Sequence, residues 1–280
     1  MALGLILSSS DFITGSLADA PWNAANNDSS HFVGGVTGSS QVNSTLSSPL
    51  TNAGGFCRSF IHNNSNRPYG FWGVSGSVDS GIYTGPYSTS KAYSMRAWLR
   101  KEDDGGGVSD SGIGLFARNV FDGTTNSIAN SGEVFNIIPG GYTLQMSKRA
   151  AFGQDASSTR ASLWLQVRGT SDPFSDGINS IQCSGSTNFE YDLDTWHRVR
   201  MDVIPIGSSG DTINVYTSSA GDVPSGQETW ELVASQWVNS TDDYYVDPTD
   251  SNLQMGFYSY GQPAGKTCYI DQFEILVQDI

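Results

Sequence analysis

Apolar and polar residues alternate with a period of two along most of the chain after residue 90. In segment 92–100 the apolar set is Tyr93, Met95, Ala97 and Leu99, and the alternate set is Ser94, Arg96, Trp98 and Arg100. The alternation recurs through Ile113, Leu115 and Ala117; Tyr142, Leu144 and Met146; Leu163, Leu165 and Val167; Val199, Met201 and Val203; Ile213 and Val215; Leu253, Met255 and Phe257; and Tyr269, Phe273, Ile275 and Val277. No window keeps the helical period of about 3.6 residues. The pattern therefore predicts β-strands with one apolar face each.

Turn-forming residues, such as those at 104–107 and 207–210, bound these segments. Short antiparallel strands with one apolar face need a second sheet to cover that face, which predicts an all-β fold, an antiparallel two-sheet β-sandwich. We expect a single domain over residues 1–280, with the core sandwich over 91–280. Residues 1–90 are richer in glycine, serine and asparagine, which predicts an irregular N-terminal part that is loop-rich or docks on a neighbour.

Composition narrows the possible partners. The 280 residues include 38% hydrophobic and 15% charged residues, so the chain can bury a sizeable core. The 28 acidic residues outnumber the 14 basic ones and give a formal net charge of −14. That charge repels phosphate backbones, so we expect no nucleic-acid partner, and it favours divalent cations. The cysteines Cys57, Cys183 and Cys268 have no metal-site spacing, and we expect buried free thiols.

The sequence indicates neither a membrane span nor export through a standard signal. It contains no run of about eighteen apolar residues, as a membrane-spanning helix would need. The apolar start of the chain, residues 1–7, has no positively charged region before it and ends at Ser8. We expect this segment to form a first strand or an arm that docks on a neighbour.

Four segments carry a resemblance to a known superfamily. They are 91–100 (KAYSMRAWLR), 194–201 (DTWHRVRM), 213–216 (INVY) and 269–275 (YIDQFEI). Their order resembles the concanavalin A-like lectin/glucanase superfamily, in its laminin-G-like branch, over residues 90 to 280. The resemblance implies a jelly roll. It implies little about activity, because this superfamily includes lectins, hydrolases, lyases and adhesion modules.

An acidic run also resembles a catalytic motif. Glu190, Asp192 and Asp194 are spaced by two, as in the paired-carboxylate strand of family 16 glycoside hydrolases. In that family the pattern ends in glutamate, whereas this chain has the shorter Asp194. The run also leads directly into Trp196. We therefore expect a solvated acidic turn and no hydrolase chemistry.

Positively charged and aromatic residues are interleaved on the face opposite the apolar one. The candidate ligand-binding residues there are Arg96, Trp98, Arg118, Trp164, Arg168, Arg200 and Tyr216. Such a face could stack sugar rings on its aromatic residues and pair its arginines with uronate or sulfate groups. The alternative is that cross-strand arginine–aromatic pairs stabilise the sheet, or that residues 1–90 cover it. A lyase would need a tyrosine or histidine base beside a charge neutraliser, and the sequence places neither His62 nor His197 near a tyrosine.

Asp271 is a candidate metal ligand. By parity it shares the apolar face of Phe273 and Ile275, where a carboxylate needs a partner. The resemblance implies that a terminal-strand aspartate helps to bind a structural Ca²⁺, with Asp11 as the candidate second ligand. A hydrogen-bonded or salt-bridged Asp271 is the alternative.

These features lead to one functional hypothesis and two alternatives. We expect no enzyme, because no catalytic constellation is evident. The hypothesis is a structural, interaction-type protein at the virion surface of a tailed bacteriophage, as head decoration, cement, fibre or adhesin, with other protein subunits as partners. The first alternative is a carbohydrate-binding, lectin-like module that binds cell-surface glycans, with an extracellular location. The second is a polysaccharide lyase or glycoside hydrolase on acidic glycans.

Overall fold

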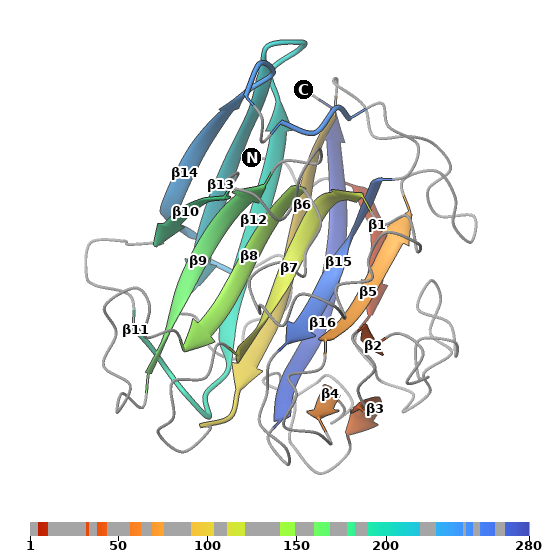
Figure 1. Ribbon diagram of the computed structural model, residues 1–280, viewed down its shortest axis with the longest axis vertical. Helices are drawn as coiled ribbons and strands as arrows, with labels where there is room; N and C mark the ends of the chain where they lie inside the picture. The colour runs from red at the N-terminus through yellow and green to blue at the C-terminus, as the bar shows by residue number, and fades with distance from the viewer. Residues whose placement is uncertain are drawn as a thin grey trace.

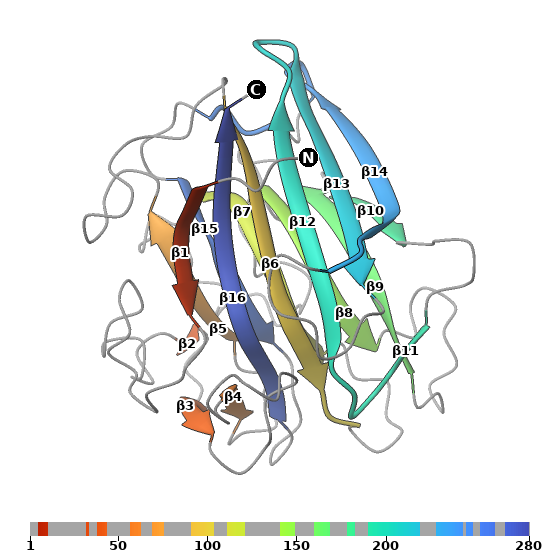
Figure 2. The same ribbon diagram turned by 180° about the vertical axis from the view of Figure 1, so that it is seen from behind.

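The computed structural model describes part of the chain. The described residues are 5–10, 32–33, 38–43, 57–62, 69–75, 91–103, 111–120, 141–148, 160–168, 178–182, 190–218, 228–242, 245–248, 253–260 and 267–279. Within them the chain forms sixteen strands, which are arranged in two sheets that lie face to face (Figures 1 and 2).

Sheet A, which faces the viewer in Figure 2, contains the last strand of the chain near its centre. Its order is β14 (Glu231–Asn239), β13 (Gly210–Ser218), β12 (His197–Pro205), β6 (Lys91–Lys101), β16 (Thr267–Asp279), β4 (Cys57–His62) and β3 (Gly38–Asn43), with β1 (Leu5–Ser10) paired to β16. All of these pairings are antiparallel.

Sheet B faces the viewer in Figure 1. Its order is β10 (Ile178–Gln182), β9 (Arg160–Arg168), β8 (Gly141–Lys148), β7 (Ser111–Val120), β15 (Leu253–Tyr260), β5 (Tyr69–Ser75) and β2 (Phe32–Val33), with β11 (Glu190–Asp192) paired to β9. These pairings are antiparallel too. Neighbours such as β6 and β16 are far apart in the sequence, so the chain crosses between the sheets. The predicted fold class, an antiparallel two-sheet jelly roll, is confirmed. Strands from residues 5–75 join both sheets.

The core lies between the sheets and contains most of the described residues that the period-two pattern assigned to it. Tyr269, which the pattern grouped with Phe273, lies instead on the outer face of sheet A against Trp196 and Arg100. Sheet A contributes Tyr93, Met95, Ala97, Leu99, Val199, Met201, Val203, Ile213 and Val215, and sheet B contributes Ile113, Leu115, Tyr142, Leu144, Met146, Leu163, Leu165 and Val167. Each is almost fully buried. Cys268 is fully buried in this core, as expected for its side chain. No helix long and apolar enough to cross a membrane occurs among the described residues.

A β-bulge in β16 corrects the orientation inferred for Asp271. The register of β16 on β6 shifts between Asp271 and Glu274, and Gln272 has a φ of 45°. An extra residue in one strand reverses the alternation of the side chains that follow it. Asp271 therefore shares the outer face of sheet A with its neighbour Trp98, while Phe273 packs in the core.

A second bulge, in β7, redirects Arg118. The pairing of β15 with β7 shifts at this point, and Arg118 has a φ of 51°. Gly141 lies opposite, and a Cβ atom there would come within 2.6 Å of the Arg118 carbonyl oxygen. The Arg118 side chain consequently reaches Asp211 of β13, in the other sheet. Arg118 thus bridges the two sheets instead of lying on an outer face as predicted.

Candidate functional site

The residues predicted to form one ligand-binding face lie on opposite sides of the sandwich. Arg96, Trp98, Arg200 and Tyr216 lie together on the outer face of sheet A, on β6, β12 and β13. Trp164 lies on the outer face of sheet B. The alternation of side chains along a strand separates inward from outward positions, but it does not reveal which sheet the strand joins. Arg168 pairs with Gly141, and its side chain lies outside the described part of the chain.

Arginines and aromatic rings form an alternating stack on the outer face of sheet A. The Arg198 guanidinium carbon lies 5.8 Å from the ring centre of Trp98 and 5.9 Å from that of Trp230. The Arg200 carbon lies 5.9 Å from Trp230 and 4.9 Å from Tyr216. The order is therefore Trp98, Arg198, Trp230, Arg200, Tyr216. These distances are within the range of cation–π attraction, so the stack holds Trp230 on the sheet.

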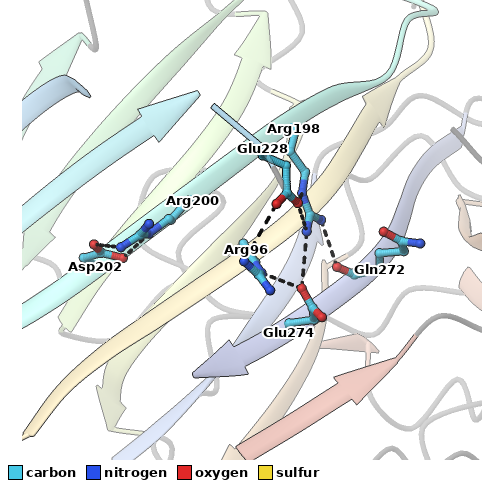
Figure 3. Close-up of polar contacts among 7 residues, drawn as sticks. All are labelled: Arg96, Arg198, Arg200, Asp202, Glu228, Gln272 and Glu274. Atoms are coloured by element: carbon cyan, nitrogen blue, oxygen red, sulfur yellow. Dashed lines mark hydrogen bonds and ion pairs between the residues drawn. The ribbon is translucent and has the colours of Figure 1, made fainter. Parts of the chain in front are cut away.

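The arginines of this stack are also paired with carboxylates (Figure 3). Arg198 Nη2 lies 2.9 Å from Glu228 and 3.3 Å from Glu274, and its Nη1 donates to the Gln272 carbonyl at 3.0 Å. Arg96 Nε lies 2.5 Å from Glu274. These side chains are almost fully buried although they lie outside the core between the sheets. Burial lowers the pKa of Arg198, and the neighbouring carboxylates oppose that shift.

Arg200 has its own partner farther along β12. It contacts Asp202 in two places, with Nε 2.7 Å from Oδ1 and Nη2 2.5 Å from Oδ2. Arg100, near the other end of the face, lies 3.7 Å from the Asp194 carboxylate. The four arginines named on this face thus each have a carboxylate partner, which leaves little positive charge for an acidic ligand.

The outer face of sheet A is exposed along the edge that β13 and β14 form, and we call this region the Trp237 surface. It consists of Thr212, Asn214, Leu232, Ser235 and Trp237 on β13 and β14. Leu232 and Trp237 are 50% and 43% exposed. Ser235 Oγ donates to Asn214 Oδ1 at 2.8 Å, and Thr212 pairs with Trp237. An exposed indole ring therefore lies in a row of neutral hydrogen-bonding groups.

The outer face of sheet B is different because the described side chains of β7, β8 and β9 on it are buried. Phe116, Thr143, Gln145, Trp164 and Gln166 are 0–4% exposed. Trp164 pairs with Gln145, and Gln166 pairs with Thr143. Thr143 Oγ1 is buried and forms no hydrogen bond with any residue that the structure describes. Trp164 therefore offers no exposed ring for stacking.

Asp211, Arg118 and Tyr142 form a buried polar cluster between the sheets. Tyr142 donates its hydroxyl to Asp211 Oδ2 at 2.6 Å, and Arg118 Nη1 contacts the same oxygen and donates to the Val246 carbonyl at 3.0 Å. Burial raises the pKa of Asp211, and Arg118 opposes that shift. The sequence indicates this cluster only through Asp211, which alternates in phase with the core residues Ile213 and Val215 and so points toward the core.

The acidic run ends in a turn that leads into β12. Asp192 and Asp194 are exposed, and Asp194 has a φ of 60°. The His197 ring lies 4.9 Å from the Tyr191 ring, centre to centre, and its Nε2 lies 2.8 Å from the Asp192 carbonyl oxygen. Burial lowers the pKa of His197. The structure thus brings together a histidine and a tyrosine that the sequence could not place near each other.

Part of the predicted calcium site lies outside the described residues. Asp271 is fully buried, and its Oδ1 accepts a hydrogen bond from the backbone N–H of Gln272 at 2.8 Å. Asp11 lies outside the described residues. Within the described residues, no group of three or more candidate ligand side chains could hold a metal ion. The calcium site stays a prediction, and full chelation that leaves the melting temperature unchanged would contradict it.

Several solved structures are similar to this chain over most of its length at low sequence identity. No family model and no curated protein sequence matches the chain. Among solved structures, the alginate lyase from Aplysia kurodai is 13% identical, and the match covers 98% of this chain and 99% of that chain with a TM-score of 0.49. The endo-beta-1,4-glucuronan lyase from the fungus Trichoderma reesei is 11% identical, with coverages of 88% and 89% and a TM-score of 0.46. The potassium-bound carbohydrate recognition domain of Emp46p is 9% identical, with coverages of 95% and 94% and a TM-score of 0.48.

These similarities correct one expectation. The expectation that the chain is not an enzyme is contradicted, because two of these similar structures are polysaccharide lyases. At these identities the similarity extends to the fold alone. The two-sheet architecture rests on the strand order and pairings of the chain itself, and membership of the concanavalin A-like superfamily stays a prediction. A phage origin stays a prediction.

Proposed function

We propose that this protein binds carbohydrate through the Trp237 surface. One observation carries the proposal: Trp237, 43% exposed, lies beside the hydroxyl and amide groups of Thr212, Asn214 and Ser235. A sugar ring has an apolar face that packs on an aromatic ring and hydroxyl groups that need hydrogen-bond partners. The surface offers both kinds of contact on neighbouring strands of one sheet.

The arrangement matters more than exposure alone. Single exposed hydrophobic residues are common on soluble proteins and need no function. Here the strand register fixes the indole next to its polar neighbours, and the stack of Trp230, Arg200 and Tyr216 holds the adjoining part of the face. The backbone positions of the groups that a ligand would contact are therefore fixed before it binds, which favours affinity.

A glycan array with the purified protein tests this proposal. We expect binding to at least one glycan class, and Trp237→Ala should weaken it about tenfold by removing the stacking surface. Ile206→Ala is the matched control, because Ile206 is 47% exposed in the turn between β12 and β13, beyond the Trp237 surface. Equal binding by wild type and Trp237→Ala would contradict the proposed site.

Assembly with other protein subunits is a second candidate function, favoured by the position of β14. Among the described strands, β14 is the last in sheet A, and it exposes Leu232 as well as Trp237. An edge strand with exposed apolar residues can pair with a strand of another chain. This candidate includes the predicted location at a virion surface. Sedimentation that shows only monomer at every concentration would remove self-assembly, and absence from purified particles would remove the virion location.

A further inference from the structure

We infer that the ligand of the Trp237 surface is an uncharged glycan and not a uronate or sulfated one. This inference rests on the proposed function and adds the substrate class. It changes the expectation drawn from the sequence, in which the arginines of this face would bind acidic sugars. The reason lies in how the arginines nearest to the surface are used.

The described arginine nearest to the Trp237 surface is already neutralised by a carboxylate. Arg200 contacts Asp202 through two nitrogen–oxygen pairs at 2.7 and 2.5 Å, and its guanidinium lies between the rings of Tyr216 and Trp230. The Arg200 and Asp202 side chains are 20% and 4% exposed, so both are largely shielded. An acidic sugar would have to displace Asp202 and leave that carboxylate buried without its partner, which is costly.

The arginines farther along the face are held in the same way. Arg198 and Arg96 share Glu228 and Glu274, and all four side chains are at most 10% exposed. Two arginines and two glutamates make this group neutral. It therefore attracts an anion at the Trp237 surface only weakly.

The Trp237 surface itself is formed by neutral side chains. Thr212, Asn214 and Ser235 carry hydroxyl or amide groups, and Leu232 and Trp237 are uncharged. The whole chain has a net charge of −14, which repels polyanions at low salt. A neutral sugar meets no such repulsion and finds both donors and acceptors in these side chains.

Titration calorimetry with matched polysaccharides tests the substrate class. The probes are a neutral glucan, a neutral mannan, a polyuronate and a sulfated galactan, each at about 0.01 M and about 1 M salt, which span Debye lengths of ~30 to ~3 Å. We expect a neutral polysaccharide to bind with an affinity that changes less than about twofold with salt. Trp237→Ala should weaken that binding about tenfold, while Ile206→Ala should not.

The outcomes separate this inference from the proposed function. The inference would be overturned if the polyuronate or the sulfated galactan bound, if that affinity fell about tenfold with salt, and if Trp237→Ala or Arg200→Gln weakened it. The proposed carbohydrate site would stand in that case. Failure of every probe, together with an empty glycan array, would overturn the proposed function. Neutral binding that Trp237→Ala leaves unchanged would overturn the site.

Discussion

The guanidinium of Arg200 lies over the ring of Tyr216, with 4.9 Å between its central carbon and the ring centre. The two residues are direct cross-strand partners on β12 and β13, so the sheet register alone brings them together. Trp98 and Arg198 are partners in the same way on β6 and β12. Trp230 lies between the two pairs, and the resulting stack fastens the segment before β14 to the sheet.

Trp230→Ala should destabilise the protein by about 2 kcal/mol, because it removes two cation–π contacts and the packing on the sheet. Urea unfolding followed by circular dichroism measures this change. Trp237→Ala is the matched control and should change the free energy of unfolding by less than about 0.5 kcal/mol, since its ring is 43% exposed. Similar losses in both variants would show that the stack does not stabilise the segment.

Glu228→Gln should cost about 3 kcal/mol of unfolding free energy, because it leaves Arg198 buried with less compensating charge. Glu231→Gln, three residues later and exposed, is the control and should have an effect below about 0.5 kcal/mol. Chemical denaturation of both variants under one buffer provides the comparison. A small effect of Glu228→Gln would mean that Glu274 alone neutralises the arginines.

The strands could be predicted from the sequence because residues such as Met95 and Leu99 alternate with polar ones, and burial of one face requires that pattern. The two bulges could not be predicted from the sequence. Arg118 and Gln272 adopt positive φ values without being glycine, so no residue type marked the change of register. The errors about Arg118 and Asp271 both follow from the assumption of unbroken alternation.

The candidate site was predictable only in part. The alternation of side chains along the strands indicated that Arg200 and Tyr216 lie on an outer face. It also grouped Trp164 with them, because alternation does not reveal which sheet a strand joins. Asp202 could have been found from the sequence, because a residue two positions from Arg200 in a strand lies on the same face. Glu228 was not, because it lies between β13 and β14 and outside any periodic strand.

Tyr142→Phe should cost about 2 kcal/mol, because it removes the hydroxyl that donates to the buried Asp211 carboxylate at 2.6 Å. Tyr216→Phe should cost less than about 1 kcal/mol, since Tyr216 is only partly buried and its hydroxyl bonds to the neutral Asn214 instead of a buried carboxylate. Thermal and urea unfolding of the two variants test the difference. If Tyr142→Phe were neutral, the contact of Arg118 with Asp211 would be sufficient to stabilise the cluster.

The stability of the protein should decrease as the pH falls from about 6.5 to about 5, and His197 should be a cause. Burial lowers the pKa of His197 in the folded state, although the Asp192 carbonyl opposes that shift. Above pH ~6.5 the imidazole is neutral in both states and does not affect the unfolding equilibrium. Below it, the unfolded chain binds a proton that the folded chain resists, so the free energy of unfolding falls by at most about 1.4 kcal/mol per pH unit.

His197→Gln tests the assignment, because glutamine keeps a donor for the Asp192 carbonyl and does not titrate. Unfolding free energies measured at several pH values in this window should depend less steeply on pH in the variant than in the wild type. His31→Gln and His62→Gln are matched controls that account for the other histidines of the chain. An unchanged slope in His197→Gln would assign the acid sensitivity to other groups, since carboxylates titrate mainly near pH 4.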